Sequence, residues 1–327
     1  MNSFYIPDLG EFAPNCGLIA LDRCSNGRFQ TNHNGVISIT ATGDHKVEFI
    51  AFADHTLAGV NSAMGYPAYY PVYPVTLQKP VKAVLVDLDG TTVRSEEFWM
   101  WIIELTTASL LDNPKFALEE SDLTHVSGHS VSEHLQYCVK KYCPDKTVEE
   151  ARQIYYQHVH REMQAIVEGN GRVNAFTPTP GVQEFLQTLK AQGVQIGLVT
   201  SGLYEKAYPE ILSAFKTMGM GDPRAFYDVI ITAGFPLRGG EAGTLGELTP
   251  KPHPWLFAEA CRVGLGIPFA ERNSVVGIDD SGAGICSIRL AGLPTIGLGG
   301  GNLVESGTKM LCDFYSHTFE AIIDYLQ

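Results

Sequence analysis

The sequence has few positive charges for its size. It carries 23 lysine and arginine residues against 36 aspartate and glutamate residues, which gives a net charge of −13. Non-specific binding to a nucleic-acid backbone requires a surplus of basic side chains. We therefore expect no nucleic-acid partner. An anionic substrate would need a metal ion or a few well-placed basic residues.

The sequence also has little that is typical of a secreted or membrane protein. Its seven cysteines are odd in number and form no Cys-x-x-Cys pair, which favours reduced intracellular thiols over a disulfide framework. No apolar run approaches the ~18 residues that span a bilayer. Residues 1–10 lack the basic and apolar regions of a signal peptide. We expect a cytoplasmic protein without a membrane partner.

The first 80 residues predict a β-rich extension followed by a connector. Residues 36–40 and 46–50 alternate roughly between apolar and polar around a turn at 42–45, which predicts a β-hairpin. The Tyr/Pro run at 66–74 is too proline-rich for a helix or a central strand. We expect these apolar residues to pack on the rest of the chain or, alternatively, to form a homodimer contact. No candidate catalytic residue lies here, so the reaction should not require this segment.

From residue 81 onward, strand and helix patterns alternate. Apolar strands at 81–86, 194–199, 229–232, 274–278 and 295–297 are separated by helical segments, which predicts a parallel sheet covered on both faces. We expect a Rossmann-like α/β core at residues 81–97 and 175–327, with a helical insert at 98–174. Within that insert, Thr147 and Glu150 fit a capping box at the start of a helix over 148–168.

Polar residues gather where the predicted strands end. They are Asp87 and Asp89 after the first strand, Thr200 and Ser201 after the second, Lys251 before a helix, and Asp279 and Asp280 after the fourth. The carboxyl ends of parallel strands meet at one edge, where open α/β sheets bind ligands. Carboxylates without His or Cys suit a hard cation such as Mg²⁺. A hydroxyl and a lysine beside them suit a phosphoryl group, and one carboxylate can attack it.

Four segments resemble, in order, the four motifs of the haloacid dehalogenase superfamily. They are Val-Leu-Val-Asp-Leu-Asp-Gly-Thr-Thr-Val at 84–93, Gly-Leu-Val-Thr-Ser-Gly at 197–202, Lys-Pro-His-Pro at 251–254, and Val-Gly-Ile-Asp-Asp-Ser-Gly-Ala-Gly at 276–284. The resemblance covers residues 81–327. Asp279 stands where glutamate is the commoner residue in this family, which leaves open whether it would bind a metal directly or through water.

The resemblance implies a role for each matched residue. Asp87 would be the nucleophile and an Mg²⁺ ligand. Asp89 would be the general acid and base and would bind the metal through its carbonyl. Thr200, Ser201 and Lys251 would bind the phosphoryl group. Asp280, together with Asp279, would complete the metal site.

The position of the helical insert resembles the cap of the β-phosphoglucomutase-like branch, and Asp89 favours hydrolysis of a phosphate ester. We therefore expect an Mg²⁺-dependent phosphatase that acts on a small phosphorylated metabolite through a phosphoaspartate. Arg94 and His129 are candidate substrate contacts. Two alternatives stay open, a sugar phosphomutase and a non-catalytic sensor of a phosphorylated metabolite.

Overall fold

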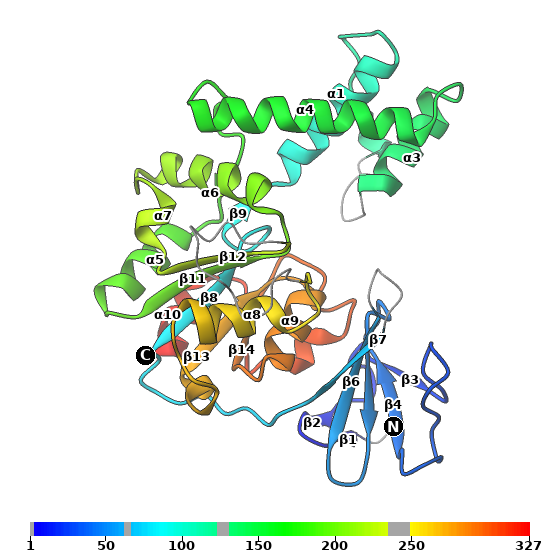
Figure 1. Cartoon of the computed structure of the whole chain (residues 1–327), viewed down its shortest axis with the longest axis vertical. Helices are drawn as coiled ribbons and strands as arrows, with labels where there is room; N and C mark the ends of the chain where they lie inside the picture. Colours follow the sequence, from blue (N-terminus) through cyan, green and yellow to red (C-terminus); the bar gives the residue numbers. More distant parts are fainter. Residues whose placement is uncertain (1–2, 62–66, 123–130, 235–248) are drawn as a thin grey trace. The chain divides into compact units, whose positions relative to one another are not determined.

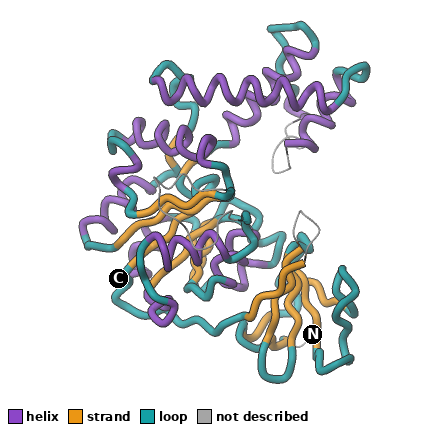
Figure 2. The backbone as a smooth tube through the Cα atoms, viewed as in Figure 1, coloured by secondary structure: helices purple, strands orange, loops and turns teal. Residues whose placement is uncertain are grey.

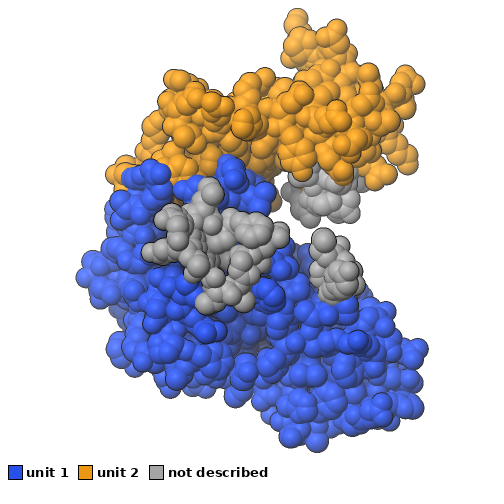
Figure 3. All heavy atoms as spheres, in the orientation of Figure 1, with its two compact units in different colours: residues 1–92, 179–207, 222–327 blue, residues 93–178, 208–221 orange. Residues whose placement is uncertain are grey.

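A computed structural model describes residues 3–61, 67–122, 131–234 and 249–327 (Figure 1). The chain divides into two compact units, one of residues 1–92, 179–207 and 222–327 and the other of residues 93–178 and 208–221 (Figure 3). The first unit contains both the N-terminal extension and the α/β core, so the three-part division expected from the sequence stays a prediction.

The core of the first unit is a six-stranded parallel sheet. Its strands, in spatial order, are β12 (Val229–Thr232), β11 (Gln195–Thr200), β8 (Ala83–Asp87), β13 (Val275–Asp279), β14 (Thr295–Leu298) and β15 (Phe314–Ser316). The consecutive residues Val84 and Leu85 are both 0% exposed, which requires cover on both faces of the sheet. This arrangement confirms the Rossmann-like α/β core.

Helices cover this sheet in two pairs. Helices α8 (Trp255–Glu259) and α9 (Gly282–Leu290) contact each other, as do α5 (Val182–Ala191) and α10 (Phe319–Leu326) (Figure 1). The Phe185 and Phe319 rings of the second pair lie 4.7 Å apart. Short helical segments complete the unit: α7 (Pro223–Phe226), a π-helical turn (Ala260–Gly264), and 3₁₀ turns at Phe269–Ser274 and Thr308–Leu311.

The N-terminal extension forms two antiparallel sheets. The larger has the order β3 (Ile19–Leu21), β4 (Ser38–Ala41), β5 (Val47–Ala51), β6 (Thr56–Asn61) and β7 (Pro67–Pro71), and the smaller pairs β1 (Phe4–Ile6) with β2 (Gly10–Phe12). In the described part of residues 1–92, the chain forms strands and loops but no helix (Figure 2). The pairing of β4 with β5 confirms the predicted hairpin.

The Tyr/Pro run differs from its expected form as a connector, because part of it is strand β7. Among the described residues this strand pairs with β6 alone, and it lies at the edge of the sheet. A proline lacks the N–H that a central strand would donate, but an edge strand has one side without a partner strand. The proline content therefore correctly excluded a central strand but did not exclude an edge strand.

The second unit contains three helices that contact one another, α1 (Glu96–Leu110), α3 (Val131–Tyr142) and α4 (Val148–Glu168). A short 3₁₀ turn lies at Glu120–Asp122, and β9 (Val93–Arg94) pairs with β10 (Thr177–Pro178). Helix α6 (Tyr204–Met218) begins in the first unit and continues in the second. The predicted capping box is present at the start of α4, where Thr147 and Glu150 bond reciprocally. Among the described residues, no helix has the length and apolar character needed to cross a membrane.

The N-terminal sheets share one hydrophobic core with the α/β sheet. Phe12 and Phe49 belong to the same buried cluster as Phe257 of α8 and Ile285 of α9. The extension therefore packs against its own chain, whereas a contact between two copies stays a prediction.

We expect the substitution Phe12→Ala to lower the free energy of unfolding by ~3–5 kcal/mol, because Phe12 is 1% exposed in this shared core. Tyr5→Ala, at a side chain 66% exposed on the neighbouring strand, should change it by less than ~0.5 kcal/mol. Denaturant unfolding at several protein concentrations measures both. Equal small losses for the two variants would contradict packing within the chain.

Candidate active site

The register of the parallel sheet brings the predicted acidic residues to one edge. Asp87 ends β8, level with Val199 of β11, and Asp279 ends the neighbouring strand β13. The carboxylate oxygens of Asp87, Asp279 and Asp280 lie within 4.8 Å of one another. The carboxyl cluster expected from the sequence is therefore present, and Asp87 and Asp279 are 6% and 0% exposed.

Lys251 lies against this cluster with a side chain only 5% exposed. Its ammonium donates hydrogen bonds to the Asp87 carboxylate, to Asp279 Oδ2 at 2.7 Å and to the Val199 carbonyl at 3.2 Å. The ammonium also lies 5.2 Å from the centre of the Phe257 ring. All three ammonium donors thus have acceptors, and the charge also lies near an aromatic ring.

Burial and mutual repulsion dominate the electrostatics of the cluster. Burial first, and then the charge of Asp279, raise the pKa of Asp87 well above its ordinary value and that of Asp280 to about 7. Burial disfavours the charge on Lys251, but attraction to Asp279 and Asp87 outweighs it and raises the pKa of its ammonium. One ammonium is shared by three carboxylates, so the group as a whole favours a further cation.

Two glycines are required for this close packing. Gly90 has a φ of +84°, and a Cβ atom there would lie 2.3 Å from Asp280 Oδ2. A Cβ atom on Gly284 would lie 1.9 Å from the Asp279 carboxylate. The glycines in the first and fourth motifs therefore make room for the acidic side chains.

Of the two predicted hydroxyl residues, Thr200 is the last residue of β11, and Ser201, which follows it, contacts Lys251. The Lys251 backbone N–H donates to Ser201 Oγ at 3.1 Å. Thr200 is 1% exposed, and its hydroxyl accepts the N–H of Gly202 at 3.0 Å. Ser201 is exposed, and neither of these bonds uses its hydroxyl proton. That hydroxyl and the positive charge of Lys251 would suit an anion.

Asp89 lies two residues beyond Asp87 and is paired with a residue that the sequence analysis missed. The Lys206 ammonium lies 3.0 Å from Asp89 Oδ2, and both side chains are about one-third exposed, at 34% and 35%. Lys206 is in the first turn of α6, where a positive charge is unfavourable next to the helix N-terminus. A lysine at this unfavourable position indicates that it has an acidic partner, and this was the signal in the sequence that could have identified the pair. Thr91 is a second missed residue, since its hydroxyl donates to Asp280 Oδ1 at 3.0 Å.

The structure tests neither of the two candidate substrate contacts. Arg94 is an exposed residue of β9 in the second unit, and His129 lies outside the described residues. Their roles stay predictions.

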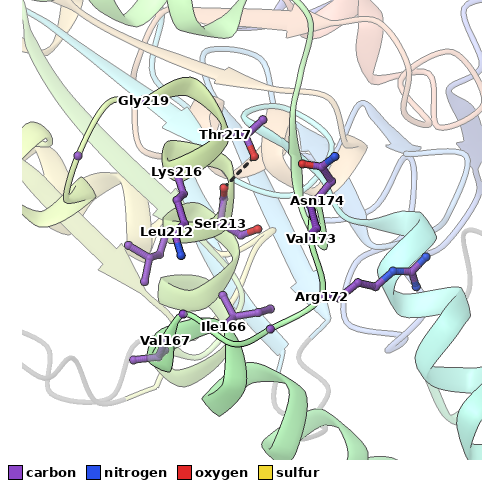
Figure 4. Close-up of a pocket in the computed structure, with 13 residues that line it drawn as sticks. Ile166, Val167, Arg172, Val173, Asn174, Leu212, Ser213, Lys216, Thr217 and Gly219 are labelled. Carbon is purple, nitrogen blue, oxygen red and sulfur yellow. Dashed lines mark hydrogen bonds between the residues drawn. The ribbon is translucent and has the colours of Figure 1, made fainter.

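The second unit has a cavity of its own, with a volume of about 660 Å³, lined by the end of α4 and the second half of α6 (Figure 4). Its side chains include Ile166 and Leu212, and Thr217 donates to the Ser213 carbonyl at 3.1 Å. The Arg172 guanidinium lies 4.7 Å from the centre of the Trp101 ring. None of the predicted catalytic, phosphate-binding or metal-binding residues lines this cavity.

The donor set of the carboxyl cluster fits a hard divalent cation. Its three ligand groups are carboxylates, the type of ligand that Mg²⁺ and Ca²⁺ prefer. Burial and then mutual repulsion raise the pKa values of Asp87 and Asp280, and a divalent cation would offset both effects. The site combines a buried carboxylate, a carboxylate cluster whose chemistry fits a cation, and a lysine beside a hydroxyl.

Comparisons with known proteins identify a family for the sequence and solved structures with a similar fold. A family model described as haloacid dehalogenase-like hydrolase matches residues 81–292. No curated protein matches the sequence.

Three solved structures have a similar fold. The match to a predicted phosphoglycolate phosphatase from Haemophilus somnus 129PT has 21% identity and a TM-score of 0.54, and covers 76% of this chain and 98% of that one. The match to a hydrolase of subfamily IA of the same superfamily, from Geobacter sulfurreducens PCA, has 17% identity and a TM-score of 0.52. It covers 77% of this chain and 100% of that one. The match to CbbY from Rhodobacter sphaeroides, solved with phosphate, has 19% identity and a TM-score of 0.50. It covers 73% of this chain and 95% of that one.

Proposed function

The chain belongs to the haloacid dehalogenase-like hydrolases, and on this basis we propose that it hydrolyses a small phosphorylated metabolite in an Mg²⁺-dependent reaction. The reaction proceeds through a phosphoaspartate on Asp87. The observation that carries the proposal is the buried Lys251 ammonium, which contacts both Asp87 and Asp279 at the carboxyl edge of the sheet. A cytoplasmic location is part of the same proposal.

Each matched side chain has a role in two chemical steps. In the first, an Asp87 oxygen attacks phosphorus and the bond from phosphorus to the ester oxygen breaks, while Asp89 gives that oxygen a proton. In the second, Asp89 takes a proton from water, whose oxygen attacks the phosphoaspartate and releases inorganic phosphate and the Asp87 carboxylate. Lys251, Thr200 and Ser201 bind the phosphoryl oxygens and offset their charge.

Mg²⁺ would be held by the carboxylates of Asp87, Asp279 and Asp280 and by the Asp89 carbonyl. When bound, it supplies charge neutralisation at the phosphoryl group. Lys251 lies between Asp87 and Asp279, so it keeps the two carboxylates in place and shares in offsetting their charge.

The helical unit is proposed to act as a cap that selects the substrate, with Arg94 and His129 as contacts. The salt bridge between Lys206 and Asp89 adds a cation near the position proposed for the leaving group.

Hydrolysis of p-nitrophenyl phosphate tests the proposal, and a panel of phosphorylated metabolites then identifies the substrate class. Conversion of glucose 1-phosphate in the presence of a bisphosphate primer would instead indicate a sugar phosphomutase. Phosphate binding without any turnover would indicate a sensor.

We expect Asp87→Asn to lower turnover by at least ~10³-fold with the fold intact, because an amide cannot attack phosphorus. Asp54→Asn, at an exposed aspartate paired with His55, is the matched control and should retain wild-type turnover. Steady-state kinetics with p-nitrophenyl phosphate measure both. Residual activity of the Asp87 variant within tenfold of wild type would refute the assignment of the nucleophile.

We expect Asp89→Asn to slow turnover by ~10²–10⁴-fold, the usual contribution of a positioned acid or base. The loss in the first step should be smaller for nitrophenyl phosphate than for an alkyl phosphate, because a leaving group of low pKa needs less protonation. Rapid-quench measurement of phosphoenzyme formation compares the two. Equal losses for both esters in that step would argue against the acid role.

We expect EDTA to abolish activity, Mg²⁺ to restore it, and Ca²⁺ to fail to restore it. Both cations bind carboxylates, but Mg²⁺ requires near-octahedral geometry, whereas Ca²⁺ takes more ligands and would disturb the approach of Asp87 to phosphorus. Metal-dependent turnover after chelation measures this. Full activity with Ca²⁺ alone would contradict it.

A further inference from the structure

The N-terminal sheet contacts the loop that carries Lys251. Tyr70 is on the edge strand β7, and its hydroxyl lies 2.7 Å from Nδ1 of His253 and 2.8 Å from Nε1 of Trp255. His253 follows Lys251 by two residues, and Trp255 begins α8. One tyrosine of the extension therefore binds both sides of the turn between Lys251 and α8.

The hydrogen atoms in this contact can be assigned from the chemistry of the groups. The Trp255 indole N–H can only donate, so the Tyr70 oxygen accepts it. The single hydroxyl proton of Tyr70 is then donated to Nδ1 of His253. His253 is 5% exposed, and burial lowers its pKa, which favours the neutral ring that accepts this bond.

The turn is held from a second side by the α/β core. The Ser287 hydroxyl, on α9, donates to the His253 carbonyl at 2.6 Å. His253 is thus fixed by its ring to the N-terminal sheet and by its backbone to the core. Lys251 lies two residues away, with its ammonium among the carboxylates.

The same sheets contact a second loop that adjoins the site. The Gly43 N–H, in the β4–β5 turn, donates to the Ser306 carbonyl at 2.8 Å. In that loop, Asn302 Oδ1 accepts the N–H of Gly282 at 2.8 Å, and a Cβ atom on Gly301 would lie 2.1 Å from the Asp280 carbonyl oxygen. The N-terminal extension therefore adjoins both the Lys251 turn and the loop that packs on Asp280.

We propose that the N-terminal sheet holds the active-site loops in place, and that Tyr70 is a positioning residue that acts on Lys251 through His253. This inference rests on the proposed phosphoryl-binding role of Lys251. The family model begins at residue 81, so Tyr70 lies outside the part of the chain that matches the family. The expectation that the reaction does not require residues 1–80 is replaced by a specific dependence on this strand.

The test is Tyr70→Phe, which removes the hydroxyl and keeps the ring. We expect kcat for p-nitrophenyl phosphate to fall by about 3- to 30-fold, since small displacements of a positioned group are costly. Inhibition by inorganic phosphate should weaken as well, because Lys251 would hold the phosphate less well. The melting temperature should fall by no more than about 4 °C.

Tyr69→Phe is the matched control. Tyr69 is the preceding residue of β7, is also partly buried, and accepts a hydrogen bond from Asn26 at 2.7 Å within the extension. Its loss should lower stability to a similar extent and leave kcat and phosphate inhibition unchanged. Wild-type kinetics for Tyr70→Phe, or the same kinetic loss in both variants, would overturn the inference.

A double-mutant cycle with His253→Leu tests whether Tyr70 acts through the histidine. If it does, the double variant should be about as slow as the slower single variant. A loss of kcat in the double variant equal to the product of the two single losses would show that Tyr70 does not act through His253. Should the wild-type chain show no turnover at all, the proposed function fails, and calorimetric binding of inorganic phosphate to the same variants decides the positioning role separately.

Discussion

The burial of one ammonium among three carboxylates is the constraint on which the rest of the site depends. If all three carboxylates are ionised, the cluster of Asp87, Asp279, Asp280 and Lys251 has a net charge of 1 − 3 = −2. Each uncompensated buried charge costs several kcal/mol. The cluster is therefore stabilised by anything that brings positive charge to this edge of the sheet, and it is sensitive to any shift of Lys251. The phosphate ester proposed as substrate is anionic, so its approach would require cations that offset this charge.

Much of the core and of the site was predictable because the signals are local. The sequence of β8 is an apolar run that ends in Asp87. Parallel pairing of β8 with β13 is then sufficient to predict that Asp279 lies near Asp87. The capping box at Thr147 involves residues three positions apart, so the sequence determines it directly. The glycines at 90 and 284 appear in the motifs, and the structure supplies the reason, which is the space that the acidic side chains occupy.

The features that were missed depend on contacts between distant segments. Tyr70 and His253 are 183 positions apart, and Lys206 and Asp89 are 117 apart, so no periodicity or spacing connects them. Strand β7 was read as a connector because proline weakens strand signals, although an edge strand tolerates it. Strand β15 was not predicted, because a three-residue strand is too short for alternation to identify. Helix α10, which has eight residues, was not predicted either.

Because the N-terminal sheet packs on the α/β core, the stability of the sheet affects the geometry of the site. Phe12 of the extension and Phe257 of α8 belong to the same buried cluster, and the Phe257 ring lies beside the Lys251 ammonium. A separately folded module could open without disturbing a neighbouring site, because local openings follow units that share few contacts. Here the extension shares a core with Phe257, which lies beside Lys251, so an opening of the sheet exposes part of the packing around that lysine. The dense core transmits such a change because it leaves little free volume in which to absorb it.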